Sequence, residues 1–151
     1  MTKIFCDIAD INQIKNFNKK KIVKGFTTNP SLMRKAGAKD YAKYSKDILA
    51  VMNKPVSCEV FADNPNEMIL QGNKINKWGK NVFVKVPVTN SKGQFMGAAI
   101  NYLNKNKVKL NITAVYTAKQ TKQILSRIDK KTKVIISIFG GRMADAGKDP
   151  V

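Results

Sequence analysis

The sequence predicts an α/β protein of the (β/α) TIM-barrel type, incomplete, with about six of the eight βα units of such a barrel. Short apolar runs rich in β-branched and aromatic residues alternate with longer helix-like stretches. The runs recur about every 25 residues, and one barrel unit uses about 30. A polar residue also stands at the same end of each run. This alternation predicts a parallel sheet covered by helices.

The predicted strands are the apolar runs themselves, bounded by polar residues and turn formers. In the run at residues 82–87, Pro87 has no N–H to donate to a neighbouring strand, so the strand is expected to end near it. The six runs span residues 3–7, 22–26, 56–61, 82–87, 108–112 and 134–139.

Capping residues indicate where the predicted helices begin. Asp10 can cap the first helix, and Asn64 followed by Pro65 opens the third. The second is expected to start near Ser31 and to run to about Met52. The fourth and fifth are expected at residues 91–103 and 117–128.

The length and composition indicate one domain with a real core. The chain has 151 residues, of which 43% are hydrophobic, and no linker or low-complexity segment interrupts it. We therefore expect residues 1–151 to form a single, partial barrel domain. The glycines form neither a GxGxxG motif nor a P-loop, so neither nucleotide-binding fold has its signature.

The sequence gives no sign of a membrane protein or a secreted one. No apolar run approaches the length of a membrane span, and residues 3–7 have the pattern of a strand, not of a signal peptide. A cytoplasmic location is expected. Cys6 and Cys58 occupy apolar strand-like segments, which favours buried free thiols over a disulfide or a metal site. The chain has no histidine, which excludes histidine-based triads and HExxH zinc sites.

The net charge of +18 raises the question of nucleic-acid binding. Apart from Lys19, Lys20 and Lys21 and the pair at 130–131, the lysines are scattered among the apolar positions of predicted helices. No DNA- or RNA-binding motif accompanies them. This distribution favours a solvated lysine-rich surface, which would also attract phosphorylated substrates.

Lys85 is the most informative residue, because it lies within an apolar strand. Burying an ammonium costs several kcal/mol unless the group is paired or gives up its proton. A lysine that gives up its proton becomes a nucleophilic amine of the kind that forms Schiff bases. The alternative is a strand lysine whose amino group reaches solvent.

The polar residues at the strand ends form a candidate site, because parallel strands bring their carboxyl ends to one edge. Taken singly, Asp7 and Asn29 also suit turns, and Asn111 suits a strand-end cap. Together they indicate a site made of Asp7, Asn29, Glu59, Lys85, Asn111, Thr113 and Ser137.

Several segments resemble the transaldolase family. Residues 25–33, Gly-Phe-Thr-Thr-Asn-Pro-Ser-Leu-Met, resemble its signature, and residues 84–87, Val-Lys-Val-Pro, resemble its Schiff-base strand. Residues 3–10, 111–113 and 137–142 are similar to its first, fifth and sixth strands. The departures are Phe26, where the signature has a smaller residue, and Ile138 and Gly140 in the sixth-strand motif.

The resemblance implies a lysine Schiff-base mechanism without a metal or organic cofactor. It implies that Lys85 forms the imine, that Asp7 takes a proton from the sugar hydroxyl, and that Glu59 with Thr113 and a water moves protons during imine formation and hydrolysis. The implied substrate-binding residues are Thr28, Asn29, Asn111, Ser137, Phe139 and Arg142, the last for phosphate.

The implied reaction transfers a dihydroxyacetone unit between sugar phosphates of the pentose phosphate pathway. The implied substrates are fructose 6-phosphate, sedoheptulose 7-phosphate, erythrose 4-phosphate and glyceraldehyde 3-phosphate. The related fructose-6-phosphate aldolases typically carry Gln at the position of Glu59 and Tyr at that of Phe139, so both residues favour transfer over simple aldol cleavage. An inactive barrel remnant that binds a partner is a further alternative.

The length is short for this family, since a complete small barrel needs upward of about 200 residues. The resemblance covers the sequence through the sixth strand, so the chain is expected to be a truncated barrel, a part completed by another chain, or a fragment of a longer product. Without further strands the first and sixth would be open edges. We therefore expect a homo-oligomer, a completing chain or aggregation.

Overall fold

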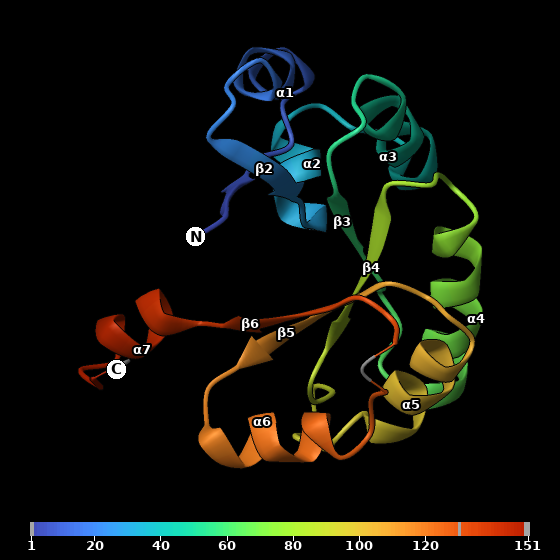
Figure 1. Ribbon diagram of the computed structural model, residues 1–151, viewed down its shortest axis with the longest axis vertical. Helices are drawn as coiled ribbons and strands as arrows, with labels where there is room; N and C mark the ends of the chain where they lie inside the picture. Colours follow the sequence, from blue (N-terminus) through green and yellow to red (C-terminus); the bar gives the residue numbers. More distant parts are fainter. Residues whose placement is uncertain (1, 130, 150–151) are drawn as a thin grey trace. The chain divides into compact units, whose positions relative to one another are not determined.

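The computed structural model describes residues 2–129 and 131–149, and in this part of the chain strands and helices alternate (Figure 1). The strands belong to one sheet and follow one another in chain order, β1-β2-β3-β4-β5-β6. A parallel sheet in chain order with helices between its strands is the topology of an incomplete (β/α) barrel. The predicted fold class is confirmed.

Contacts along the chain define two compact units. The first unit comprises Met1–Glu59 and Lys74–Val84, and the second comprises Val60–Asn73 and Lys85–Val151. Two elements contribute residues to both units, the helix α4 (Pro65–Asn76) and the strand β4 (Val82–Pro87).

The first unit contains three parallel strands, β1 (Ile4–Asp7), β2 (Val23–Thr27) and β3 (Val56–Glu59). In the β1–β2 register Asp7 lies opposite Thr27, so the last residues of both strands are neighbours. The β3 strand ends at Glu59, earlier than the run at 56–61 predicted, and the other two strands begin and end within one residue of their predicted bounds.

Gly25 allows the strands of this unit to pack closely. A Cβ atom at this position would lie 2.2 Å from the Phe5 ring and 2.9 Å from the Pro55 carbonyl oxygen. Both distances are too short for a side chain, so the signature segment requires glycine here for packing.

The predicted second helix is two helices in the structure. The first, α2 (Pro30–Lys35), ends before Gly37, whose φ of +88° is left-handed. The second, α3 (Tyr41–Ala50), begins anew after Asp40, whose side chain accepts from the Lys43 amide at 2.7 Å. A left-handed glycine followed by an N-cap residue stops one helix and starts another. The first helix, α1 (Ile11–Asn18), has Asp10 as its cap, as predicted.

The second unit continues the alternation. Figure 1 shows its last two strands side by side, and their pairing is parallel. Asn64 caps α4 through the Glu67 amide at 3.0 Å, as predicted. The elements after β4 are α5 (Gly97–Lys105), β5 (Leu110–Val115), α6 (Ala118–Leu125), β6 (Val134–Ile138) and α7 (Gly140–Asp145).

The helix expected at residues 91–103 begins later, at Gly97. Ser91 is held in a turn instead, because its amide and hydroxyl both donate to the Asp63 carboxylate. Gly93, with a φ of +75°, continues this turn. Because Asp63 lies 28 residues before Ser91, the sequence pattern around residue 91 does not reveal this contact.

The fifth strand is displaced toward the C-terminus from its predicted range of 108–112. Its pairing with β6 shifts register between Ile112 and Val115. Ala114, inside this shift, has a φ of +59°, which is left-handed and uncommon for a residue with a Cβ. The irregularity is a β-bulge that lies directly after Thr113.

The core residues are those of the predicted apolar runs and helix faces. Phe26, Ile48 and Val56 are fully buried in the first unit, and Leu103 and Ile112 in the second. No helix in residues 2–129 and 131–149 is long and apolar enough to cross a membrane.

The two cysteines are free thiols in different environments. Cys58 is buried, as predicted, whereas Cys6 is only half-buried. Burial raises the pKa of the Cys58 thiol to about 12. Cys58 is therefore an uncharged, unreactive thiol at neutral pH.

Candidate active site

Lys85 lies inside the apolar strand β4 and is buried. Its exposed fraction is 8%, and Val84 and Val86 on either side are at 0%. The Lys85 carbonyl accepts from the Val60 amide at 3.0 Å, so the backbone here is fixed by strand pairing. The strand thus holds a buried lysine side chain between two buried valines.

Thr113 lies beside the end of β4. Its carbonyl accepts from the Val88 amide at 2.9 Å, which brings the end of β4 next to the part of β5 that carries Asn111 and Thr113. The Thr113 side chain is 2% exposed, and its hydroxyl has no hydrogen-bond partner within residues 2–129 and 131–149. A buried hydroxyl without a partner costs about 1–3 kcal/mol, so it indicates a place for a water or a ligand.

Asn111 and Ser137 are brought together across the β5–β6 pair. The Ser137 hydroxyl donates to the Asn111 side-chain oxygen at 2.7 Å. Asn111 is 1% exposed and Ser137 is half-buried. This hydrogen bond fixes the amide of Asn111 with its oxygen toward β6.

Phe139 and Arg142 lie after β6, at the start of α7. The Phe139 ring contacts the Tyr116 ring edge to face, with 5.7 Å between centroids, and its amide donates to the Val115 carbonyl at 2.9 Å. Arg142 is exposed. The aromatic ring is therefore fixed, whereas the guanidinium is accessible to a charged molecule.

Asp7 and Thr27 form a hydrogen-bonded pair at the ends of β1 and β2. The Thr27 hydroxyl donates to the Asp7 carboxylate at 2.8 Å, and Asp7 remains exposed. Sequence reasoning missed Thr27 as a partner, although its position opposite Asp7 follows once the register is known.

Thr28 and Asn29 directly follow β2 and have different hydrogen-bond partners. Thr28 is fully buried, and its hydroxyl donates to the Ser57 carbonyl at 2.8 Å. The Asn29 side-chain oxygen accepts from the Leu32 amide at 2.9 Å and so caps α2. Thr28 is thus a strand-joining residue, and Asn29 is a helix cap that retains an amide nitrogen as a donor.

Glu59 is the last residue of β3, and Tyr41 from α3 holds its main chain. The Tyr41 hydroxyl accepts from the Glu59 amide at 2.7 Å and donates to the Glu59 carbonyl at 3.0 Å. Sequence reasoning missed Tyr41, because nothing in a single aromatic residue near a helix start indicates this contact.

The predicted site residues fall into two groups. Four belong to the first unit, where Asp7 and Glu59 end strands and Thr28 and Asn29 follow β2. The other six belong to the second unit, Lys85, Asn111, Thr113, Ser137, Phe139 and Arg142. Among the described residues, no three His, Cys, Asp or Glu side chains are grouped as metal ligands.

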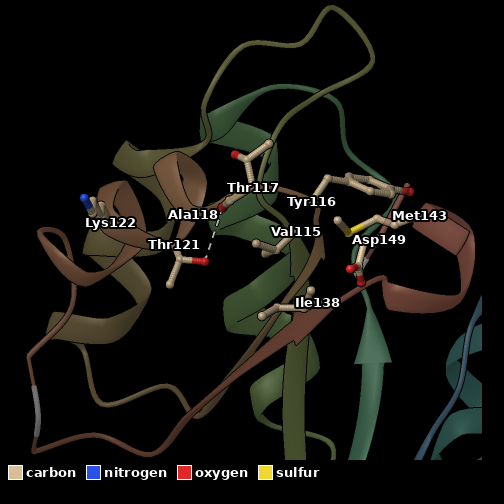
Figure 2. A pocket seen from close by; sticks show the side chains of 9 residues that line it. All are labelled: Val115, Tyr116, Thr117, Ala118, Thr121, Lys122, Ile138, Met143 and Asp149. Carbon is tan, nitrogen blue, oxygen red and sulfur yellow. Dashed lines mark hydrogen bonds between the residues drawn. The ribbon is translucent and has the colours of Figure 1, made fainter. Parts of the chain in front are cut away.

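A pocket of about 500 Å³ in the second unit is separate from these residues (Figure 2). Figure 2 shows the Tyr116 ring, Met143 and Asp149 on one side and Thr121 on the other, with Ile138 between. None of the predicted site residues lines it. Its lining residues are Val115, Tyr116, Thr117, Ala118, Thr121, Lys122, Ile138, Met143 and Asp149.

Comparisons with known proteins identify the family. The model of the transaldolase/fructose-6-phosphate aldolase family matches residues 4–150. A probable transaldolase of Methanococcus maripaludis is 37% identical over 147 residues, which are 97% of this chain and 64% of the relative. A probable transaldolase of Streptococcus agalactiae is 35% identical, with the same coverage. The chain thus spans about two thirds of the length of these relatives, and it belongs to the transaldolase/fructose-6-phosphate aldolase family.

Proposed function

We propose that the protein acts as a transaldolase that forms a Schiff base on Lys85. The observation that carries this proposal is the burial of Lys85, at 8% exposed, within an apolar strand of a protein of this family. The amine of a lysine is the nucleophile that attacks a ketone to form an imine.

The proposed reaction begins when the Lys85 amine attacks the ketone of a ketose phosphate and water leaves. The positive imine nitrogen then withdraws electrons from the carbon–carbon bond to be broken. Asp7 takes the proton of the sugar hydroxyl as this bond breaks and an aldose phosphate leaves. The dihydroxyacetone unit stays on Lys85, adds to a second aldose phosphate, and is released when water hydrolyses the imine.

Glu59 and Thr113 are proposed to move protons through a water while the imine forms and hydrolyses. The unpartnered buried hydroxyl of Thr113 supports this role, because it has unused capacity to bind that water.

The remaining residues are proposed to bind the sugar phosphate. Asn111, fixed by Ser137, and Asn29, through its amide nitrogen, suit hydrogen bonds to sugar hydroxyls. Arg142 suits the phosphate, because it is exposed and can bind two oxygens at once. Thr28 is proposed to act by holding the strand end from which Asn29 projects.

The same proposal includes the domain extent, the cellular location, the pathway and the association of the protein. It covers residues 1–151 as a single partial barrel domain, a cytoplasmic location, and a place in the pentose phosphate pathway with the sugar phosphates named above as substrates. It also includes association with a further copy or a completing chain. The exposure of Ile138 at the end of β6, at 58%, supports this last point.

Transfer and simple aldol cleavage are distinguished by their products. With fructose 6-phosphate and erythrose 4-phosphate, a transaldolase produces sedoheptulose 7-phosphate, whereas an aldolase releases free dihydroxyacetone from fructose 6-phosphate alone. We expect the first product, because Glu59 and Phe139 follow the transaldolase pattern. Release of dihydroxyacetone without an acceptor would favour the aldolase alternative. The absence of both products would contradict the proposed activity.

Binding to heparin that sugar phosphates do not compete with would support the nucleic-acid alternative instead.

A further inference from the structure

The hydrogen bonds that β2 donates to β3 form an alternating series that stops before Glu59. Along β2, Phe26 donates to the Pro55 carbonyl at 2.8 Å and Thr28 donates to the Ser57 carbonyl at 3.1 Å. The next donor in this alternating series would be residue 30, but β2 ends at Thr27 and α2 begins at Pro30. Residue 30 is a proline and has no N–H to donate. The main-chain groups of Glu59 on this side therefore need another partner.

Tyr41 supplies that partner for both groups at once. Its hydroxyl is 2.7 Å from the Glu59 nitrogen, from which it accepts, and 3.0 Å from the Glu59 oxygen, to which it donates. One phenol oxygen thus replaces the strand neighbour that β2 no longer provides.

The Tyr41 side chain is itself held in place. Tyr41 is the first residue of α3, directly after its Asp40 cap. Its ring meets the Trp78 ring edge to face, with 5.8 Å between centroids and 62° between planes. Burial raises the pKa of the Tyr41 hydroxyl above its usual value. The hydroxyl therefore stays protonated and can donate a hydrogen bond to the Glu59 carbonyl.

We infer that Tyr41 is the positioning residue for Glu59: its hydroxyl fixes the main chain at the end of β3 and so sets the direction in which the Glu59 carboxylate projects. The inference rests on the proposed function, in which that carboxylate moves protons during imine formation. A catalytic group misplaced by about 1 Å can lose on the order of a hundredfold in rate. Tyr41 thus acts through Glu59 and touches no substrate.

The test compares Tyr41→Phe with Tyr44→Phe in the full chain. Both residues lie in α3, and the Tyr44 hydroxyl donates elsewhere, to the Ala9 carbonyl at 3.1 Å. Phenylalanine at position 41 keeps the ring on Trp78 and removes the hydroxyl alone. The first readout is hydrogen exchange at the Glu59 amide, and the second is the rate of borohydride-trapped adduct formation with fructose 6-phosphate over a range of concentrations.

We expect Tyr41→Phe to speed exchange at the Glu59 amide by on the order of tenfold. We also expect it to lower the trapping rate at saturating sugar by about tenfold or more, with an apparent KM that changes by less than about twofold. Tyr44→Phe is expected to leave exchange at Glu59 unchanged.

Faster exchange with an unchanged trapping rate would overturn the inference, because Tyr41 would then be structural alone. Unchanged exchange would overturn it too, since the hydroxyl would not be holding Glu59. If the parent chain forms no adduct, the proposed function fails and the positioning role fails with it. Exchange at Glu59 would still report whether the hydroxyl holds the strand end, so the two failures are distinguishable.

Discussion

The strands β4 and β6 have similar sequences and very different surroundings. Val-Phe-Val-Lys-Val-Pro and Val-Ile-Ile-Ser-Ile are both apolar runs with one polar residue near the end. The first five residues of β4 are buried, whereas no residue of β6 is fully buried. In the described part of the chain, β4 has a strand on each side and β6 is paired with β5 alone. Neighbouring strands, and not the apolar pattern by itself, decide how deeply a strand is buried.

This difference changes what a polar residue means in each strand. Ser137 in β6 is neutral and half-buried, and its hydrogen bond to Asn111 gives it a structural role. Lys85 in β4 is a buried lysine, 8% exposed, in a strand whose first five residues are all buried. The proposed imine on Lys85 would give this buried position a chemical role.

The largest effect that we expect is that of Lys85→Met on imine formation. We expect complete loss of the borohydride-trapped adduct, because no other side chain takes over the imine. We also expect a free energy of unfolding that is unchanged or higher, since a charge-capable group leaves a buried site. Adduct mass and urea unfolding measure the two effects. Loss of the fold in this variant would indicate that Lys85 is a structural residue.

Truncation of one apolar side chain in each strand tests the burial difference directly. Val86 is at 0% exposed in β4 and Ile138 at 58% in β6. We expect Val86→Ala to lower the free energy of unfolding by about 2 kcal/mol, and Ile138→Ala by less than about 0.5 kcal/mol, although the second removes more atoms. Urea titration followed by circular dichroism measures both. Equal losses would show that β6 is covered in solution, as a second copy or a completing chain would cover it.

The hydroxyls of Thr113 and Ser137 are expected to respond in opposite directions. Thr113→Val replaces a buried hydroxyl without a partner by a methyl group, so stability is expected to rise by up to about 1 kcal/mol. Ser137→Ala removes the hydrogen bond to Asn111 and is expected to cost about 1 kcal/mol. If Thr113→Val instead lowers stability, the hydroxyl has a partner in solution that holds the fold, and its availability to a catalytic water is contradicted.

The smallest expected effect concerns the bulge in β5, the strand between β4 and β6. Ala114 has a φ of +59°, a conformation that glycine adopts more readily. We expect Ala114→Gly to raise the free energy of unfolding by about 0.5 kcal/mol, and Ala114→Val to lower it. The same urea titration measures both. The opposite order for the two variants would show that residue 114 is not left-handed in solution.

The sequence predicted most elements because their signals are local. Asp10 and Asn64 cap helices as expected, and the apolar runs form the expected strands. The division of the second helix depended on the backbone of Gly37, and the late start of α5 depended on the contact between Ser91 and Asp63. Such features arise from conformation and from residues distant in sequence, which a periodicity does not reveal.

In the candidate site, too, the local features were predicted and the contacts between distant residues were not. The positions of Asp7 and Glu59 at strand ends, and of Lys85 within β4, followed from the alternation of elements. The partners of these positions did not, because Thr27 and Tyr41 become neighbours only through strand register and helix packing. The sequence therefore predicted where these candidate residues lie in the strands, but not the side chains that contact them.

Borohydride reduction of the protein incubated with fructose 6-phosphate tests the central claim most directly. Intact mass and peptide mapping then locate any adduct, with Lys85→Met as the matched control. The account predicts a three-carbon adduct on Lys85 in the parent chain and none in the variant. A parent chain that is folded by circular dichroism and carries no adduct, or carries one on another lysine, would contradict it.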